Sequence, residues 1–375
     1  MRPTPITPDL VRGAAELETT ARGLRPHRLP GWARRQFPDP YLGLMESQAA
    51  GVRLTFRTPA TALTLTTHPS RLSYTGLPRP RGRIDVAVDG EVVLRDVLTG
   101  GDHTELDMAT GVATPHQGPP HTTEVSGLPG REVTVEIWLP HNEAVELVAL
   151  HADAPVAAVP EPGRRWVHYG SSISQGSNAA GPTEVWTAVA ARAAGVQLRN
   201  LGFGGNAMVD PFVARTIRDA PAELLSVKLG INVVNGDTMR LRAFVPAVHG
   251  FLDTVRDGHP DTPLLLISPL HCGIHENTPG PGAFDPASLA TGTPRFIATG
   301  DPDDVPRGKL TLTVVRTALA EIAAQRADPN LHHLDGTALY GPADAETHPL
   351  PDGLHPDTAA HRIIGTRFAE YLGKY

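Results

Sequence analysis

The stretch WVHYGSSISQGSN, residues 166–178, is an apolar run that breaks into Gly170 and two serines. Serine and glycine are common in turns, so Ser171-Ser172 has an ordinary reading as a turn or a helix cap. The alternative is that one serine is a nucleophile at the end of a buried strand. The elements around this stretch, and the polar residues that follow other strands, distinguish the two readings.

From residue 164 onward, short apolar runs alternate with helical stretches. The expected strands span 165–169, 196–200, 224–229, 263–268 and 331–335, and the expected helices span 184–194, 240–258, 310–327 and 358–372. Strands that are apolar on both faces and joined by helices form parallel sheets covered on both sides. We therefore expect an α/β fold with a parallel five-stranded sheet, with Trp166 and Trp186 in its core.

Residues from about 50 to 150 alternate between apolar and polar side chains instead. Ile84, Val86 and Val88 alternate in IDVAVDG, and Asp89-Gly90 supplies a hairpin turn. Several such strands without a helical stretch indicate an antiparallel, all-β sandwich. The Pro-rich stretch DAPVAAVPEPG, residues 153–163, predicts a boundary. We expect a β-sandwich domain at 1–155, a linker at 156–163 and an α/β domain at 164–375, with the turn at 139–144 as the docking contact.

Length and composition narrow the classes of protein and partner. The 375 residues, 40% of them hydrophobic, suffice for two cores, and the net charge of -7 offers no basic stripe for nucleic acid. No run of 18 apolar residues predicts a membrane span, and the N-terminus lacks a signal-peptide h-region. The single cysteine, Cys272, cannot form an internal disulfide. We expect a cytoplasmic protein, and the oligomeric state stays open.

Polar residues follow four of the segments that make up the α/β half. They are Gly170-Ser171-Ser172, Gly204-Gly205-Asn206, Asn232, and the pair Asp352 and His355 before the last helix. Because ligands bind beyond the carboxyl ends of parallel strands, we expect these groups to meet at one edge of the sheet.

This set contains what acyl transfer requires. Ser172 is the candidate nucleophile, His355 the candidate base, and Asp352 the group that orients the imidazole. The backbone N–H groups of Ser172 and Gly205 and the side-chain amide of Asn232 are candidate donors to an oxyanion. The elbow Gly-x-Ser-x-Gly of α/β-hydrolases is absent around Ser172, because Ser174 occupies the position of its last glycine.

The four blocks resemble those of the SGNH (GDSL) hydrolase superfamily. The matching stretches are Gly170 to Gly176, Gly205, Gly230-Ile231-Asn232, and Asp352 to His355. Ser171 and Val233 depart from the pattern, because the family usually has Asp at both positions. The resemblance implies a flavodoxin-like α/β/α domain, the site residues named above, and no cofactor or metal. The preceding β domain, expected to be jelly-roll-like, resembles two-domain carbohydrate esterases and the salicylyl acyltransferases of polyketide tailoring.

Three functions follow as hypotheses. The first is a serine esterase that hydrolyses a carboxylic ester through an acyl-enzyme on Ser172. The second is an acyltransferase that passes the same acyl group to an alcohol or sugar acceptor. The third is a carbohydrate-binding protein whose hydrolase domain is degenerate. In each case the expected partner is a small molecule, with no nucleic acid and no membrane.

Two features after the fourth strand have alternative interpretations. His271, Cys272 and His275 could bind zinc, but the Pro- and Gly-rich segment around them favours a substrate-facing loop. The segment from Gly273 to Gly308 is too long for a simple connection. It is either part of the acyl or acceptor pocket or a mobile surface loop.

Overall fold

The computed structural model describes residues 1–77, 79–107, 110–160 and 163–374. The chain divides into two compact units that do not correspond to a single cut in the sequence. The first contains Met1–Gly31, Asp39–Pro162 and Ala180–Thr183, and the second contains Trp32–Pro38, Gly163–Ala179 and Glu184–Tyr375. Each half of the sequence therefore contributes a short segment to the other unit.

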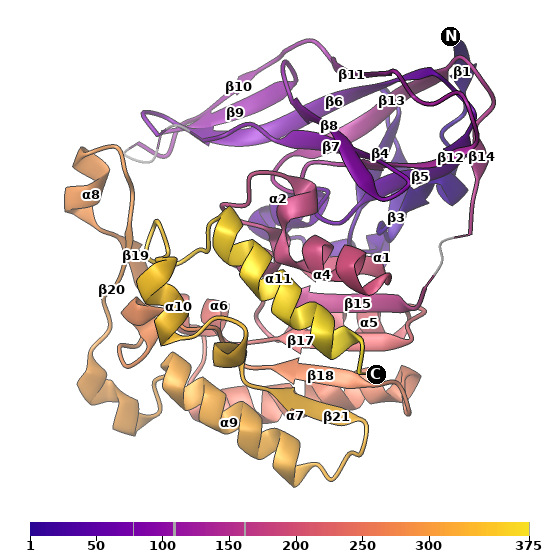
Figure 1. Ribbon diagram of the computed structural model, residues 1–375. Coiled ribbons are helices and arrows are strands. Elements are labelled where there is room, and N and C mark those ends of the chain that lie inside the picture. The colour runs from indigo at the N-terminus through magenta and orange to yellow at the C-terminus, as the bar shows by residue number, and fades with distance from the viewer. Residues whose placement is uncertain (78, 108–109, 161–162, 375) are drawn as a thin grey trace. The chain divides into compact units, whose positions relative to one another are not determined.

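The first unit is built on two β-sheets (Figure 1). The eight-stranded sheet contains β1 (Arg2–Thr4), β3 (Glu16–Thr19), β4 (Leu24–His27), β6 (Ala62–Tyr74), β9 (Asp102–Leu106), β10 (Ala113–His116), β11 (His121–Ser126) and β13 (Ala144–Ala152). The six-stranded sheet contains β2 (Val11–Arg12), β5 (Arg53–Thr58), β7 (Arg83–Val88), β8 (Glu91–Val97), β12 (Val133–Trp138) and β14 (Ala157–Ala158).

The two sheets share one apolar core, which confirms the β-sandwich. Leu63 and Leu65 of β6 lie in the same cluster as Phe56 of β5 and Val135 of β12, all with no exposed surface. The pairing is antiparallel except between β6 and β9, which run parallel. Strand β14 lies within the expected linker and pairs with β5, while residues 161–162 of that linker lie outside the described residues.

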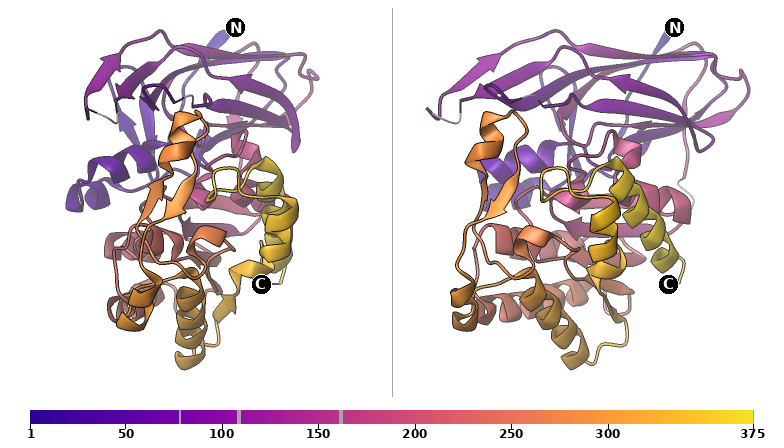
Figure 2. Two further views of the ribbon diagram at one scale, coloured as in Figure 1. Left: turned by 90° about the vertical axis from the view of Figure 1, so that its left-hand side faces the viewer. Right: turned by 60° about the vertical axis from the view of Figure 1, so that its left-hand side comes forward.

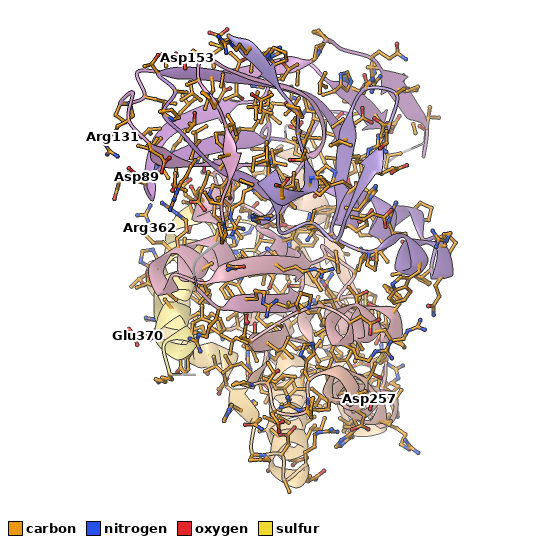
Figure 3. The ribbon with its side chains drawn as sticks, turned by 90° about the vertical axis from the view of Figure 1, so that its right-hand side faces the viewer. Asp89, Arg131, Asp153, Asp257, Arg362 and Glu370 are labelled. Carbon is orange, nitrogen blue, oxygen red and sulfur yellow. The ribbon has the colours of Figure 1, made fainter. Side chains whose placement is uncertain are left out.

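The expected hairpin turn joins β7 and β8. Asp89 and Gly90 have φ angles of 47° and 87°, the left-handed values that a two-residue hairpin loop requires. Arg131 reaches Asp89 with its guanidinium 3.3 Å from the carboxylate, and both residues are labelled in Figure 3. Helices α1 (Gly31–Gln36) and α2 (Pro40–Ser47) lie before residue 50, where we expected no elements. The Asp39 side chain caps α2 by accepting a hydrogen bond from Leu42 N.

The second unit contains the parallel five-stranded sheet. Its order is β16 (Gln197–Gly202), β15 (Arg165–Gly170), β17 (Leu224–Lys228), β18 (Leu264–Ile267) and β21 (Leu331–Leu334), and all neighbours are parallel. Numbered along the chain this is 2-1-3-4-5, the flavodoxin-like order. The order reverses at β15 and β17, so the loops after these two strands flank the point where ligands bind in such sheets.

All four expected helices are present. They are α4 (Trp186–Ala194), α7 (Leu241–Gly258), α9 (Leu312–Gln325) and α11 (Thr358–Leu372). We missed α5 (Pro211–Arg218), although Pro211 at its first turn after Asp210 is a usual start signal. We also missed α10 (Pro342–Thr347) and the short helices α3 (Ser172–Gln175) and α6 (Ile231–Asn235), which follow β15 and β17 directly.

Trp166 and Trp186 pack in the core as expected. Both have no exposed surface, and both rings contact Phe368 of α11, with centroids 5.3 and 5.2 Å away. Helices α4 and α11 therefore cover one face of the sheet through aromatic contacts. Helix α7 packs against α5 and α9. Among the described residues, no helix is long and apolar enough to cross a membrane.

The long segment after β18 has secondary structure of its own. It contains β19 (Gly282–Phe284), α8 (Pro286–Ala290) and β20 (Phe296–Ala298), and the two strands pair antiparallel. Figure 2 shows this hairpin and α8, in orange, standing away from the five-stranded sheet. The segment is thus a folded insertion in the second unit rather than an irregular loop.

Candidate active site

Ser172 lies at the carboxyl end of a central strand. β15 ends at Gly170, Ser171 caps α3 by accepting a hydrogen bond from Ile173 N at 3.3 Å, and Ser172 is the first residue of that helix. A Cβ on Gly170 would lie 2.3 Å from Ser174 Oγ, so only glycine fits beneath this turn. The local sequence therefore places the Ser172 hydroxyl at the edge of the sheet where the strand order reverses.

Ser172 and His355 are 183 residues apart in the sequence, and the structure brings them together with Asp352. Ser172 Oγ lies 2.9 Å from His355 Nε2, and His355 Nδ1 lies 2.7 Å from Asp352 Oδ2. The other carboxylate oxygen, Asp352 Oδ1, accepts hydrogen bonds from the backbone N–H groups of Leu354 and His355 at 2.9 and 2.7 Å. The loop before α11 therefore holds the carboxylate against the imidazole.

The charge of Asp352 determines which imidazole nitrogen carries the proton. Burial would raise the pKa of Asp352, but hydrogen bonds from His355 and from backbone N–H groups lower it below its usual value. The ionised carboxylate only accepts hydrogen bonds, so Nδ1 of neutral His355 carries the proton. Nε2 is then left with a lone pair directed at the Ser172 hydroxyl.

Two residues from the segment after β18, and Asn178, support the loop that carries Asp352 and His355. Phe296 N donates to Asp352 O at 2.7 Å, and the Phe296 ring meets the His355 ring edge-on, with centroids 5.6 Å apart. The buried Cys272 thiol donates to Gly353 O at 3.4 Å. Asn178 adds a hydrogen bond to Asp352 Oδ2 at 3.3 Å. Sequence reasoning assigned none of these contacts, because they join segments without a shared motif.

The three candidate oxyanion donors have no acceptor within the described residues. These donors are the N–H groups of Ser172 and Gly205 and the amide Nδ2 of Asn232. Gly205 adopts a left-handed φ of 68°, which favours glycine. Asn232 Oδ1 accepts from Ala207 N at 3.0 Å, so the amide orientation is fixed with its NH₂ group free.

Buried side-chain amides form hydrogen bonds between β16, with the loop after it, and helix α3, which begins at Ser172. Gln175 Oε1 accepts from Gly204 N at 2.7 Å, and Asn200 Nδ2 donates to Ser174 O at 2.7 Å. Beneath them, His168 lies 2.8 Å from Ser174 Oγ and 2.7 Å from Ser226 Oγ. Burial and the nearby charge of Lys228 lower the pKa of His168, so its imidazole is neutral. These fully buried polar groups fix the backbone that carries Ser172 and Gly205.

The two departures from the family pattern have structural explanations. Ser171 is fully buried and acts as the N-cap of α3, a position that serine and aspartate fill equally well. Val233 is fully buried within α6, and its apolar side chain needs no hydrogen-bond partner there. Neither residue belongs to the hydrogen-bonded set of Ser172, His355 and Asp352.

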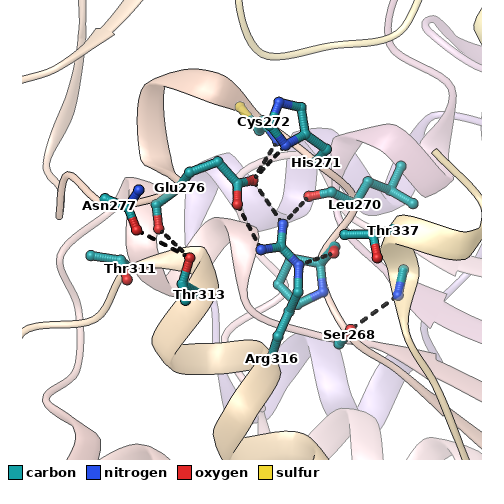
Figure 4. A network of polar contacts seen from close by, with 12 residues as sticks. Ser268, Leu270, His271, Cys272, Glu276, Asn277, Thr311, Thr313, Arg316 and Thr337 are labelled. Carbon is teal, nitrogen blue, oxygen red and sulfur yellow. Dashed lines mark hydrogen bonds and ion pairs between the residues drawn. The ribbon is translucent and has the colours of Figure 1, made fainter. Parts of the chain in front are cut away.

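His271, Cys272 and His275 each have protein partners. His271 Nδ1 lies 3.3 Å from Glu276, which also accepts two 2.7 Å hydrogen bonds from Arg316 (Figure 4). Arg316 further donates to the carbonyl oxygens of Pro269 and Leu270, so it fixes the chain just after β18.

His275 Nε2 lies 3.0 Å from Asn235 Oδ1. Burial raises the pKa of Cys272 to about 12, which keeps it a neutral thiol. Over the described ranges, the structure contains no group of three metal-ligating side chains.

Comparisons with known proteins find matches for both halves of the chain. Residues 163–275 match the family model described as GDSL-like Lipase/Acylhydrolase, and residues 10–148 match the N-terminal domain of SsfX3. Searching curated protein sequences found no match.

Several solved structures are similar over most of the chain. The salicylyl-acyltransferase SsfX3 from a tetracycline biosynthetic pathway has 27% identity and a TM-score of 0.80, covering 98% of this chain and 95% of its own. A protein from Bacteroides ovatus assigned as a GDSL-like lipase has 19% identity and a TM-score of 0.66, with 97% and 95% covered. A family two carbohydrate esterase from Clostridium thermocellum has 14% identity and a TM-score of 0.58, with 87% and 92% covered.

The family match over residues 163–275 and the similarity to an acyltransferase with 27% identity support an enzyme that acts on esters. Within that class, the chain shares both its β-rich N-terminal domain and its α/β domain with the salicylyl-acyltransferase SsfX3, to which it is similar from end to end.

Proposed function

We propose that this protein is a serine esterase that hydrolyses a carboxylic ester through an acyl-enzyme on Ser172. The observation that carries the proposal is the continuous hydrogen-bonded series from Ser172 Oγ to His355 and from His355 to Asp352, at 2.9 and 2.7 Å. A serine alcohol is a weak nucleophile unless a base removes its proton during attack. The lone pair on His355 Nε2 is directed at that proton.

The first half-reaction follows from this geometry. Ser172 Oγ attacks the ester carbonyl carbon while His355 Nε2 takes the hydroxyl proton, and the carbonyl electrons move onto the oxygen. The unpaired N–H groups of Ser172 and Gly205 and the Asn232 amide stabilise that oxyanion. The C–O bond to the leaving alcohol then breaks, and the imidazolium returns its proton to the alcohol. Asp352 stabilises the imidazolium throughout.

The second half-reaction uses the same groups with a new nucleophile. In the esterase, water gives a proton to His355 and attacks the acyl carbonyl carbon. The bond to Ser172 Oγ then breaks, the acid is released, and His355 returns the proton to Ser172 Oγ. In the second candidate function, an acyltransferase, an alcohol replaces water and leaves as a new ester. The match of residues 10–148 to the SsfX3 N-terminal domain and the similarity to SsfX3 over 98% of the chain favour this alternative.

One experiment separates the two functions. The protein is incubated with aryl esters and acyl-CoA thioesters, with and without a panel of alcohols and sugars, and the products are identified by mass spectrometry. Hydrolysis that no alcohol diverts supports the esterase. Ester formation with an alcohol at millimolar concentration, in competition with about 55 M water, supports the acyltransferase. No turnover of any ester would contradict both functions and would favour the third hypothesis, a carbohydrate-binding protein.

Asn232 provides a test of oxyanion stabilisation. Asn232→Ala is expected to lower kcat by roughly 10²- to 10³-fold, because one donor to the transition state is lost. Asn232→Asp keeps an oxygen that accepts from Ala207 N but replaces the donor with a negative charge, so its kcat is expected to fall at least as far. Steady-state kinetics on an aryl ester measure both. Full activity in Asn232→Asp with loss in Asn232→Ala would show that Asn232 acts only by holding Ala207.

A further inference from the structure

Two phenylalanines, Phe284 and Phe296, form an aromatic pair beside the candidate base. They belong to the hairpin of β19 and β20, which is orange in Figure 2. The Phe296 ring meets the His355 ring edge-on, with centroids 5.6 Å apart. Phe284 is paired directly with Phe296 across the hairpin, and their ring centroids are 4.7 Å apart. A series of contacts therefore runs from Ser172 through His355 to the aromatic pair, all within the second unit.

The hairpin that carries the aromatic pair is fixed at its base to α6. Gly282, the first residue of β19, lies so close to Asn235 that a Cβ would collide with the amide oxygen of Asn235. A Cβ on Gly280 would collide with the carbonyl oxygen of Val234 in the same way. Helix α6 also carries Asn232, one of the candidate oxyanion donors.

The second strand of the hairpin contacts the loop before α11. Phe296 N donates to Asp352 O at 2.7 Å, and a Cβ on Gly353 would lie 3.1 Å from Phe296 O. The hairpin therefore contacts both the helix that carries an oxyanion donor and the loop that carries the candidate base. A surface held in place on two sides loses little freedom when a ligand binds, which favours binding.

The outer ring of the aromatic pair is accessible to a ligand. Phe284 is 38% exposed, whereas Phe296 is partly buried. A single exposed apolar side chain is ordinary on a protein surface. Phe284 differs because its ring extends an aromatic contact that begins at the imidazole of His355. Sites for small molecules combine such apolar and aromatic walls with a few polar groups.

The chemistry of acylation determines which part of the substrate approaches these rings. When the acyl-enzyme forms, the bond between the carbonyl carbon and the alcohol oxygen breaks, and the imidazolium of His355 donates its Nε2 proton to that oxygen. The leaving oxygen must therefore lie within hydrogen-bond reach of Nε2. The oxyanion points instead at the N–H groups of Ser172 and Gly205 and at the Asn232 amide. The alcohol is thus the part of the ester that is held next to His355.

We propose that Phe284 and Phe296 contact the alcohol part of the ester and make the enzyme selective for alcohols that carry an aromatic ring. This inference rests on the proposed function, because it assigns the alcohol that leaves when Ser172 is acylated. In an acyltransferase the same surface receives the acceptor, because the reverse of acylation uses the same positions.

The alternative is that the aromatic pair serves only to pack the hairpin. An isolated two-stranded hairpin is marginally stable, so it needs apolar contacts. Packing alone predicts that loss of the Phe284 ring loosens the hairpin and the His355 loop, which lowers hydrolysis of all esters by the same factor. Direct contact with the alcohol predicts a loss that depends on the alcohol. Ratios between substrates therefore separate the two roles.

Benzyl acetate, allyl acetate and allyl benzoate test the assignment. The first two share an acyl group and have leaving alcohols of similar acidity, and the last two share an alcohol. Stacking between aromatic rings corresponds to a preference of about twofold to tenfold, so the kcat/KM for benzyl acetate is expected to exceed that for allyl acetate by this factor. In Phe284→Ala the benzyl-to-allyl ratio is expected to fall by the same factor, while the benzoate-to-acetate ratio keeps its wild-type value.

Ile297 provides the matched control. It is the next residue of β20 and is 37% exposed, and its side chain projects from the opposite face of the hairpin because successive strand residues alternate. Ile297→Ala is expected to keep both ratios. Phe284→Leu retains an apolar side chain without the ring, and its benzyl-to-allyl ratio is expected to fall even if Phe284→Ala does not fold. A wild-type ratio in Phe284→Leu would overturn the aromatic contact.

The outcomes distinguish this inference from the proposed function. A wild-type enzyme that prefers allyl acetate, or that hydrolyses 4-nitrophenyl esters but not their benzyl counterparts, overturns the role of the aromatic pair and leaves the esterase intact. Equal benzyl-to-allyl ratios in wild type and Phe284→Ala also overturn it. A fall in the benzoate-to-acetate ratio instead would show that Phe284 contacts the acyl group, which contradicts the assignment to the alcohol. Absence of turnover on every ester contradicts the proposed function.

Discussion

Replacing Ser172 by alanine is expected to lower kcat for ester hydrolysis by roughly 10⁴- to 10⁶-fold. The variant lacks the hydroxyl that we propose forms the acyl-enzyme, so the residual rate is expected to come from water attacking within the oxyanion donors. Within the described residues, the Ser172 hydroxyl makes no hydrogen bond besides the one it donates to His355 Nε2, so the fold is expected to remain intact. Stopped-flow kinetics and mass spectrometry of the trapped acyl-enzyme measure the effect, and circular dichroism checks folding.

The neighbouring serine is the matched control. Ser171→Ala removes a hydroxyl one residue away, which caps α3 through Ile173 N and is not directed at His355. This change is expected to cost about 1 kcal/mol of stability, as the loss of a cap does, and to leave covalent acylation of Ser172 in place. If Ser171→Ala instead abolished acylation while Ser172→Ala kept it, the nucleophile would be the other serine.

The second large effect is expected for Asp352→Asn, which should lower kcat by roughly 10⁴-fold. The Asn oxygen can still accept from Leu354 N and His355 N, so its NH₂ group would face His355 Nδ1. An amide donor at that position makes Nδ1 the acceptor and moves the imidazole proton to Nε2. His355 would then present a proton, rather than a lone pair, to the Ser172 hydroxyl. The pH–rate profile and the imidazole nitrogen shifts in NMR measure this change of tautomer.

Asp357 supplies the control for that variant. Its side chain caps α11 by accepting from Ala360 N at 2.9 Å. Asp357→Asn retains an oxygen for the cap, and kcat is expected to remain within about threefold of wild type, because asparagine and aspartate cap helices equally well. Equal losses in both variants would indicate a general disturbance of the loop rather than a specific role for Asp352.

The α/β half was predictable because its elements follow from local patterns. Solid apolar runs such as LLLI at 264–267 predicted buried strands, and amphipathic stretches such as 358–372 predicted helices at almost the observed limits. The elements that we missed are short: α5 has 8 residues and α3 has 4. Segments of this length carry too little periodicity for their helical state to be read from the pattern alone.

The limits of the two units are less visible in the sequence. A proline-rich stretch predicted one boundary, yet residues 180–183 group with the first unit and residues 32–38 with the second. Hydrogen bonds from Thr183 to Asp85 join residues 180–183 to the first unit. Stacking of Phe37 on Phe212 joins residues 32–38 to the second. Because these pairs are 98 and 175 residues apart in the sequence, no local pattern predicts them.

The sequence by itself determined the chemical types at the strand ends and their order, because turn residues, nucleophile and base occupy fixed offsets from buried strands. Only the tertiary structure decided which atoms meet. It put His355 Nε2 at 2.9 Å from Ser172 Oγ, and it left three N–H donors without an acceptor among the residues that the structure describes. The physical reason is the separation in sequence between the residues that interact. Strand and helix patterns arise from neighbours a few residues apart, whereas hydrogen bonds and burial depend on segments that the chain brings together from nearly two hundred residues away.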